Sequence, residues 1–273
     1  MPPQRPTVVR RQLGRRLRRL REVAGKTEKD LVEANLLSRA KLHRIESGRT
    51  PIKVSDVRAM CWMYGVDQAT IEVLVALAVG TNGQGWQEDY GVPGWFSLYI
   101  GLEATADHAG FYNPELVPGL LQTPAYLRAL YEAGINKTDE EAVQRQIKIR
   151  QERQQAITIR TPPLRVTTVL GAGVMARRVG SDAVMAEQTA QLRELNQLDH
   201  VDIRVMPWEV GAHAAQHIGA FAILDFADPN DPPVVYLEAQ TGAQYLEKPE
   251  ELGEYRKVYE SIYQKTIPIE EYK

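Results

Sequence analysis

The chain has 273 residues, of which 44% are hydrophobic and 25% charged, so its length supports about two domains and its composition is that of an ordinary globular protein. No apolar run approaches the roughly 18 residues of a membrane-spanning helix, and the first residues lack the apolar core of a signal peptide. The single cysteine, Cys61, excludes an intrachain disulfide framework. We therefore expect a cytoplasmic protein that does not enter membranes, with Cys61 buried among its apolar neighbours.

The net charge of −2 conceals a strong asymmetry along the chain. Residues 1–60 hold 16 Lys and Arg against 6 Asp and Glu, a balance of +10, whereas the rest of the chain holds 17 against 29, a balance of −12. A basic head on an acidic body is typical of a nucleic-acid-binding module joined to a second domain.

The first predicted helix covers Arg10–Ala24. Leu13, Leu17 and Leu20 recur at helical spacing on one face, and Gly25 ends the helix. Arginines alternate with these leucines, which favours packing as the first helix of a bundle over binding to a lipid surface.

Two short helices follow, and they are the most specific feature of the sequence. Thr27 can cap the first, with Asp30 completing a capping-box pair, and Ser38 can cap the second. The turn between them is Asn35-Leu36-Leu37. Such a pair is typical of a helix-turn-helix, whose second helix enters the major groove of DNA.

The second of these helices predicts a DNA contact surface. Leu42 and Ile45 form its buried face, so its basic side chains project elsewhere. We expect Arg39 and Lys41 to reach base edges, because these residue types donate to guanine. The rest of the predicted DNA-binding set is Thr27, Ser38, His43, Arg44, Arg49, Arg15 and Arg18, of which the last four would hold phosphates. An ordinary helical hairpin with a solvated basic face is the alternative.

Two further helices, Ser55–Tyr64 and Ala69–Val79, complete a predicted five-helix domain over residues 1–80. The glycine-rich stretch that follows predicts a linker over residues 81–94, and the second domain covers residues 95–273.

Residues Ser38–Arg49, followed by Pro51 and an amphipathic helix, resemble the phage-repressor-like (xenobiotic-response-element, XRE) family of helix-turn-helix transcriptional regulators. Two positions depart from that pattern. Leu36 stands where a turn glycine is usual and would be strained at positive φ, and Glu28 stands where a phosphate-binding glutamine is expected. Because one such helix reads only a few base pairs, we expect a homodimer on half-sites about 34 Å apart in double-stranded DNA.

The second domain alternates helical and β-rich segments. Its predicted helices are Trp95–His108, which Phe111–Pro114 breaks, Thr138–Ile157 with a Thr138–Glu141 capping box, Asp182–Leu198, and Pro249–Ile267. Its predicted strands are Leu164–Leu170, Val201–Met206, Phe221–Phe226 and Val234–Ala239, the last two as a hairpin. The expected fold class is mainly α with an α+β C-terminal domain, that is, a five-helix N-terminal bundle followed by helices and a small mixed or antiparallel sheet.

The run Glu115–Leu130, ELVPGLLQTPAYLRAL, resembles the signature of a domain of unknown function found behind helix-turn-helix modules in actinobacterial regulators. The resemblance extends over most of residues 90–265. It implies a regulator of development or antibiotic production, or an antitoxin-like protein whose C-terminal domain binds a small protein partner. That domain usually carries an Asp-Glu pair where this chain has Gly171-Ala172, so any role of the pair is absent.

Two other patterns suggest chemistry. Gly171–Ala176 matches the dinucleotide fingerprint G-x-G-x-x-A after a strand, but Gly180 interrupts the helix that should follow. His213 and His217 have a metal-ligand spacing, but flanking glycines favour a loop. We expect no metal, no cofactor and no catalytic residue, and an NAD(P)-binding enzyme is the remote alternative.

Aromatic residues gather after the linker, and core packing is their default explanation. The alternative is a pocket for a small-molecule effector. Its candidate residues are Trp95, Tyr99, Phe111, Tyr112 and Tyr126. The second domain is therefore predicted to sense a ligand, to bind a protein partner or to dimerise.

Overall fold

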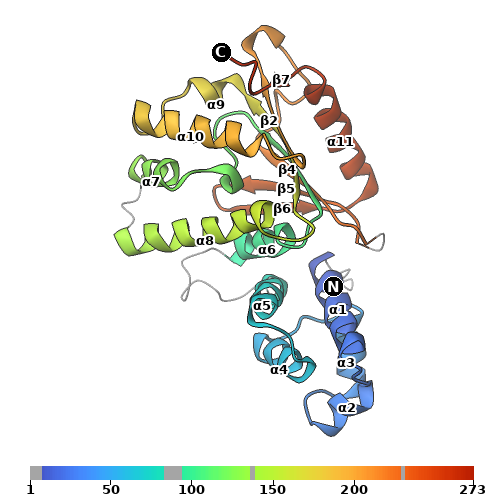
Figure 1. The fold of residues 1–273 in the computed structure, drawn as a ribbon. Coiled ribbons are helices and arrows are strands. Elements are labelled where there is room, and N and C mark those ends of the chain that lie inside the picture. Colours follow the sequence, from blue (N-terminus) through green and yellow to red (C-terminus); the bar gives the residue numbers. More distant parts are fainter. Residues whose placement is uncertain (1–7, 83–93, 136–138, 229–230) are drawn as a thin grey trace. The chain divides into compact units, whose positions relative to one another are not determined.

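The computed structural model describes residues 8–82, 94–135, 139–228 and 231–273. In these ranges eleven α-helices and a seven-stranded sheet confirm the predicted fold class (Figure 1). The chain divides into two compact units, one of residues up to Thr105 with Asp228–Pro232, and one of Ala106–Ala227 with Pro233–Lys273. None of the described helices combines the length and the apolar composition needed to span a bilayer.

The first unit contains α1 (Val8–Val23), α2 (Glu28–Glu33), α3 (Arg39–Glu46), α4 (Val54–Tyr64), α5 (Gln68–Asn82) and α6 (Gly94–Glu103). Helices α1 to α5 match the five predicted for the head. Residues 83–93 of the predicted linker lie outside the described residues, and Thr81 and Asn82 belong to α5. The domain limits at residues 80 and 95 remain predictions.

In the turn between α2 and α3, the residue with positive φ is Asn35, one position before Leu36, the residue for which the sequence raised this conformation. Asn35 has a φ of 53°, and it is the one non-glycine residue with positive φ in the described ranges. Asparagine tolerates this conformation better than leucine does. The strain considered for Leu36 therefore does not arise.

Two glycines let α1 approach α3 at backbone distance. A Cβ atom at Gly14 would lie 2.3 Å from the carbonyl oxygen of Ile45. At Gly48, which has a φ of 69°, a Cβ atom would lie 2.8 Å from the Cα atom of Arg11. Backbone atoms cannot move aside as the end of a flexible side chain can, so the C-terminal end of α3 is fixed against α1.

The second unit is built on a mixed sheet with the strand order β6-β5-β4-β1-β2-β3-β7. The strands are β1 (His108–Asn113), β2 (Arg165–Gly171), β3 (Val201–Met206), β4 (Phe221–Asp225), β5 (Val234–Ala239), β6 (Gly242–Leu246) and β7 (Ile267–Pro268). Strands β1, β2 and β3 run parallel, and the other neighbouring pairs are antiparallel. The antiparallel β4–β5 pair confirms the predicted hairpin.

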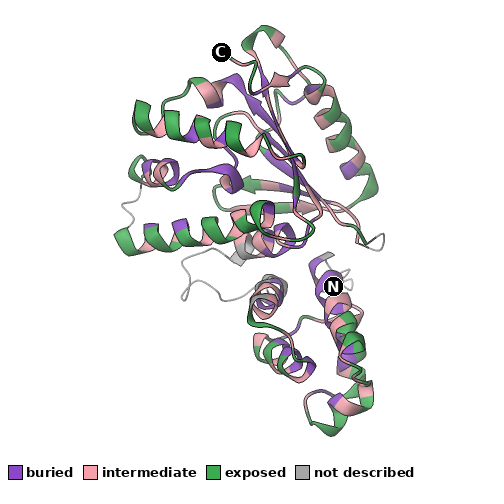
Figure 2. Cartoon of the chain, viewed as in Figure 1, coloured by how far each residue is buried: buried purple, intermediate pink, exposed green. Residues whose placement is uncertain are grey.

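Helices lie on both faces of this sheet (Figure 1). Helix α11 (Pro249–Tyr263) covers one face, and α7 (Pro124–Glu132), α8 (Glu140–Thr158), α9 (Ala172–Ala176) and α10 (Asp182–Leu195) lie on the other. Under α11, Tyr112, Val169 and Phe221 form a core cluster with Leu252 and Ile262 of the helix. The central strands are mostly buried (Figure 2), so alternate side chains of β1 fill both layers.

The largest departure from prediction is β1. The helix predicted to reach His108 ends at Glu103, and His108–Asn113 forms a central strand where the sequence predicted only the end of that helix and a break at Phe111–Pro114. A run with Gly110 and Asn113 has weak β propensity, and its place between β2 and β4 stabilises it instead. Strands β6 and β7 are further additions to the four predicted strands.

Other helix ends also differ. Asp139 caps α8 by accepting from the backbone N–H of Ala142 at 2.6 Å, whereas Thr138, the predicted cap, lies outside the described residues. Helix α10 ends at Leu195 and not at Leu198, and α11 ends at Tyr263 because the chain then turns into β7.

A polar network joins α11 to the sheet. His108 Nδ1 lies 2.9 Å from Asp225 Oδ2, and His108 Nε2 lies 2.9 Å from Thr167 Oγ1. Tyr259 donates to the same Thr167 oxygen at 3.0 Å, and Arg256 contacts Asp225. Burial raises the pKa of Asp225, but the hydrogen bond from His108 and the charge of Arg256 outweigh it, so this pKa lies below its ordinary value.

Gly14→Ala should destabilise the first unit by about 1–3 kcal/mol, because the added methyl group meets backbone oxygen atoms. The matched control is Gly253→Ala in α11, where nothing lies within 4 Å of the new Cβ atom. There the substitution should be neutral or stabilising by up to about 1 kcal/mol, because alanine favours helices. Urea unfolding followed by circular dichroism measures both, and an equal loss in the two variants would contradict the close approach.

Asp225→Asn should lower the free energy of unfolding at pH 7 by about 1.5–3 kcal/mol, because charged hydrogen bonds are lost. The folded pKa of Asp225 is depressed. Its contribution is therefore complete above the unfolded value of about 3.9 and is lost as the pH falls through the folded pKa. Thermal melts between pH 7 and pH 3 should show the native chain losing stability faster than the variant on acidification. Parallel plots of stability against pH for the two proteins would show that folding does not lower the pKa of Asp225.

Candidate nucleic-acid interface

Side-chain caps begin both helices of the helix-turn-helix. The backbone N–H of Asp30 donates to Thr27 Oγ1 at 3.3 Å, and the backbone N–H of Thr27 donates to Asp30 Oδ2 at 2.6 Å, which confirms the capping box. Ser38 accepts from the backbone N–H of Lys41 at 3.3 Å and caps α3. These bonds satisfy donors that helix ends leave unpaired, so two short helices can form.

A buried ion pair fixes α3 on α1. Arg21 Nε donates to Glu46 Oε1 at 2.7 Å and Arg21 Nη2 to Glu46 Oε2 at 3.0 Å, with the side chains only 10% and 8% exposed. Arg21 Nη1 also donates to the Lys26 carbonyl oxygen at 3.1 Å. The hydrogen bond to Glu46 raises the pKa of Arg21. Beside this fork, Leu42 and Ile45 are buried as predicted.

The outer face of α3 is exposed and basic. Arg39, Ala40, His43 and Arg44 are all exposed on it. Together with Glu28 of α2 they line one shallow depression. The structure therefore brings together three residues of the predicted DNA-binding set, namely Arg39, His43 and Arg44.

Two carboxylates contact the first cations of α3. Arg39 Nε donates to Glu28 Oε2 at 2.8 Å, yet the Arg39 side chain is 77% exposed. Lys41 Nζ donates to Asp56 Oδ2 of α4 at 2.6 Å, and the Lys41 side chain is 40% exposed. Arg39 thus stays on the outer face, whereas Lys41 is directed toward α4. Base contact by Lys41 requires it to leave Asp56 first.

The remaining predicted contact residues are more scattered. Arg49 is exposed beyond the end of α3, and Arg18 is exposed on α1 in an ion pair with the residue one turn later. Arg15 is half-buried, and burial lowers its pKa. Thr27 and Ser38 are exposed, with their hydroxyl groups used by the caps. Phosphate contacts by the arginines remain predictions.

Sequence reasoning did not identify Glu28 and Asp56 as parts of this surface. They lie 11 and 15 positions from their cations, so helical spacing within one element does not pair them. The available signal was the charge of Glu28 at a position where a glutamine was expected. Only a tertiary arrangement that brings the first turns of α2 and α3 together sets this carboxylate beside Arg39.

Four of the five aromatic residues predicted for an effector pocket have described side chains, and all four are buried. Phe111 and Tyr112 are neighbours on β1, so their side chains enter opposite faces of the sheet. Tyr99 lies in α6 and Tyr126 in α7. These four side chains are at most 4% exposed, so they are core residues. The side chain of Trp95 lies outside the described residues.

The dinucleotide fingerprint is not arranged for a cofactor. Strand β2 ends at Gly171, and α9 stops after five residues. A Cβ atom at Gly171 would lie 2.8 Å from the carbonyl oxygen of Pro114, so the absence of a side chain at Gly171 makes room for the backbone at Pro114 and not for a pyrophosphate. His213 and His217 lie in a loop, and no three His, Cys, Asp or Glu of the described ranges are placed to hold a metal. Burial raises the pKa of Cys61 to about 11, as expected for an inert thiol.

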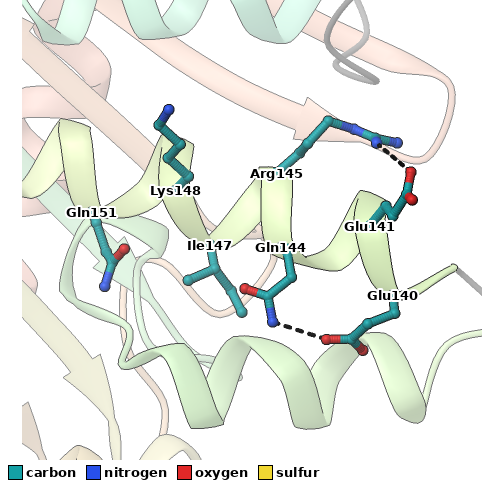
Figure 3. A pocket seen from close by; sticks show the side chains of 7 residues that line it. All are labelled: Glu140, Glu141, Gln144, Arg145, Ile147, Lys148 and Gln151. Atoms are coloured by element: carbon teal, nitrogen blue, oxygen red, sulfur yellow. Dashed lines mark hydrogen bonds and ion pairs between the residues drawn. The ribbon is translucent and has the colours of Figure 1, made fainter.

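A depression along α8 is a poor ligand site (Figure 3). Its lining residues, Glu140, Glu141, Gln144, Arg145, Ile147, Lys148 and Gln151, all belong to this one helix. Gln144 donates to Glu140 at 2.8 Å, and Arg145 pairs with Glu141 at 3.8 Å. These polar groups satisfy each other, whereas a binding pocket directs polar groups from several elements at the ligand.

Comparison with known families decides the classification. Residues 96–271 match the family described as Domain of unknown function (DUF5753). The chain belongs to the DUF5753 family. Residues 12–74, ahead of the DUF5753 domain, match a Helix-turn-helix domain, which indicates a DNA-binding regulator. No curated protein and no solved structure matches the chain.

Arg21→Met should lower the free energy of unfolding of the helix-turn-helix by about 3–5 kcal/mol, because it leaves the Glu46 carboxylate buried without its partner. The matched control, Arg18→Met, removes an exposed arginine of the same helix and should leave stability nearly unchanged. Urea unfolding measured by circular dichroism compares them. If Arg21→Met were as stable as Arg18→Met, the buried pair would not hold α3.

Proposed function

We propose that this protein is a sequence-specific, DNA-binding transcriptional regulator. The observation that carries the proposal is the outer face of α3, where Arg39, His43 and Arg44 gather at one depression. Guanine edges in the major groove present acceptors that match arginine donors, and phosphates attract a head with a charge of +10 over residues 1–60. The buried Arg21–Glu46 pair supports the proposal because it presents this face rigidly.

The residues of this face take different roles. Arg39 stands at the first position of α3, where residues of a recognition helix reach base edges. Lys41 can join it after leaving Asp56. Arg44 and Arg49, farther along, serve the phosphates that flank the groove. Arg15 and Arg18 of α1 would add phosphate contacts.

One α3 reads only a few base pairs, so we assign the protein a homodimer on two half-sites about 34 Å apart. The proposal gives the chain no catalytic step and no cofactor.

For the DUF5753 domain we favour binding of a small protein partner, as in an antitoxin-like regulator. Tyr99, Phe111, Tyr112 and Tyr126, the described aromatic residues of the predicted effector pocket, are packed in the core. Residues 96–273 hold 17 Lys and Arg against 25 Asp and Glu, and this balance of −8 suits a basic partner. Native mass spectrometry of the chain purified from its own cells separates the options. A stable complex with a small basic protein supports partner binding, and a bound small molecule supports a ligand sensor instead.

Arg39→Ala should weaken binding to a selected operator by about 1–3 kcal/mol and relax base preference at one position. Arg49→Ala should weaken all duplexes alike and reduce the slope of log affinity against log salt by about 1. Fluorescence anisotropy with the operator and a scrambled duplex measures both variants. Unchanged base preference in Arg39→Ala would remove this residue from the reading face.

A further inference from the structure

Glu28 is a negative charge on a surface that otherwise attracts DNA. It occupies the first turn of α2, and its side chain is 38% exposed. It lines the same depression as Arg39 and Arg44. A carboxylate in this place repels phosphates and so weakens binding to any duplex. A negative charge that weakens non-specific binding to DNA can still favour binding to one sequence. The contact between Glu28 and Arg39 explains how.

The Glu28 carboxylate contacts Arg39 through the donor nearest the main chain. Arg39 Nε donates to Glu28 Oε2 at 2.8 Å, which joins the first turns of α2 and α3. The guanidinium group carries further N–H donors on its two Nη atoms. Because Glu28 is bonded to Nε, the two Nη atoms keep N–H donors in the planar fork that matches the O6 and N7 acceptors of guanine.

We propose that Glu28 is a specificity-determining residue that positions Arg39 for a guanine edge. This inference rests on the proposed function and names the means of its selectivity. A guanidinium group held before DNA arrives loses less conformational freedom on forming its base contact. It must also break the ion pair before it can swing to a phosphate. Glu28 thus lowers affinity for all DNA and raises the ratio of specific to non-specific binding.

The second carboxylate near α3 shows that the effect depends on placement. Asp56 holds Lys41 from α4, and the Lys41 side chain is 40% exposed, against 77% for Arg39. Asp56 therefore directs its cation away from the outer face, whereas Glu28 holds its cation on that face. Of the two pairs, Glu28–Arg39 is the one whose cation is both paired and exposed on the outer face of α3.

The test uses the full-length chain and a library of random duplexes. Operators are selected with the native chain, with Glu28→Ala, Glu28→Gln and Arg39→Ala, and with the double variant Glu28→Ala/Arg39→Ala. Glu33→Ala is the matched control, because Glu33 is another exposed carboxylate of α2 that pairs with Lys29 and not with Arg39. Anisotropy then gives each variant's affinity for the selected operator and for a scrambled duplex. Circular dichroism melts show that each variant is folded.

Glu28→Ala should bind the scrambled duplex about fivefold more tightly. Its ratio of specific to non-specific affinity should fall about tenfold, with the guanine preference blurred at the position that Arg39→Ala also relaxes. Glu28→Gln keeps an acceptor oxygen for Arg39 Nε, so it should retain this preference while its non-specific affinity rises. In the Arg39→Ala background, Glu28→Ala should change base preference no further.

Three results would overturn the inference. Glu28→Ala could select the native operator with the native ratio, or Glu33→Ala could lower the ratio as much as Glu28→Ala does. Glu28→Ala could also change base preference in the absence of Arg39. A native chain that bound no duplex at low salt would instead remove the proposed function, and this inference with it. If Glu28→Ala fails to fold, the comparison of Glu28→Gln with Glu33→Ala still decides the charge effect.

Discussion

The Arg21–Glu46 ion pair is the interaction on which the geometry of the helix-turn-helix depends. Two charges that are about 90% buried are favourable only when their hydrogen bonds are complete, and the two-pronged contact is formed in one relative placement of α1 and α3. Gly14 and Gly48 remove the side chains that would hold the helices apart. An apolar contact could bind the helices as tightly, but it would define the rotation of α3 less sharply. That rotation decides which side chains of α3 face outward.

Three carboxylates pair with cations of the helix-turn-helix and give these cations different positions, which a count of charges along the sequence does not distinguish. Glu46 forms a buried ion pair with Arg21 that joins α3 to α1. Asp56 holds Lys41 toward α4, and Glu28 keeps Arg39 on the outer face. The count of 16 Lys and Arg over residues 1–60 therefore overstates the number of cations free to meet phosphates. The surface that results is smaller and more ordered than the sequence suggests, which suits selective recognition better than uniform attraction.

The sequence predicted features whose signals are local. The caps at Thr27 and Ser38, the buried Leu42 and Ile45, and most helices follow from spacing and capping chemistry within a few residues. Strand β1 could not be predicted this way, because it is stabilised by pairing with β2 and β4, which are distant in sequence. The Glu28–Arg39 and Lys41–Asp56 pairs were not predicted either, because each joins two helices whose paired residues are 11 and 15 positions apart in the sequence. The aromatic residues after the linker looked alike in sequence, and only strand alternation showed that Phe111 and Tyr112 enter separate layers.

If the outer face of α3 binds duplex DNA, hydrogen exchange should locate that contact directly. Amide exchange of the full-length chain can be followed by mass spectrometry at low salt, with and without an excess of a selected duplex. We expect DNA to slow exchange in peptides that cover α2, the turn and the first half of α3, and to leave α7 to α11 of the DUF5753 domain unchanged. Unaltered exchange across residues 27–49, or protection confined to the DUF5753 domain, would contradict a DNA-binding role for α3.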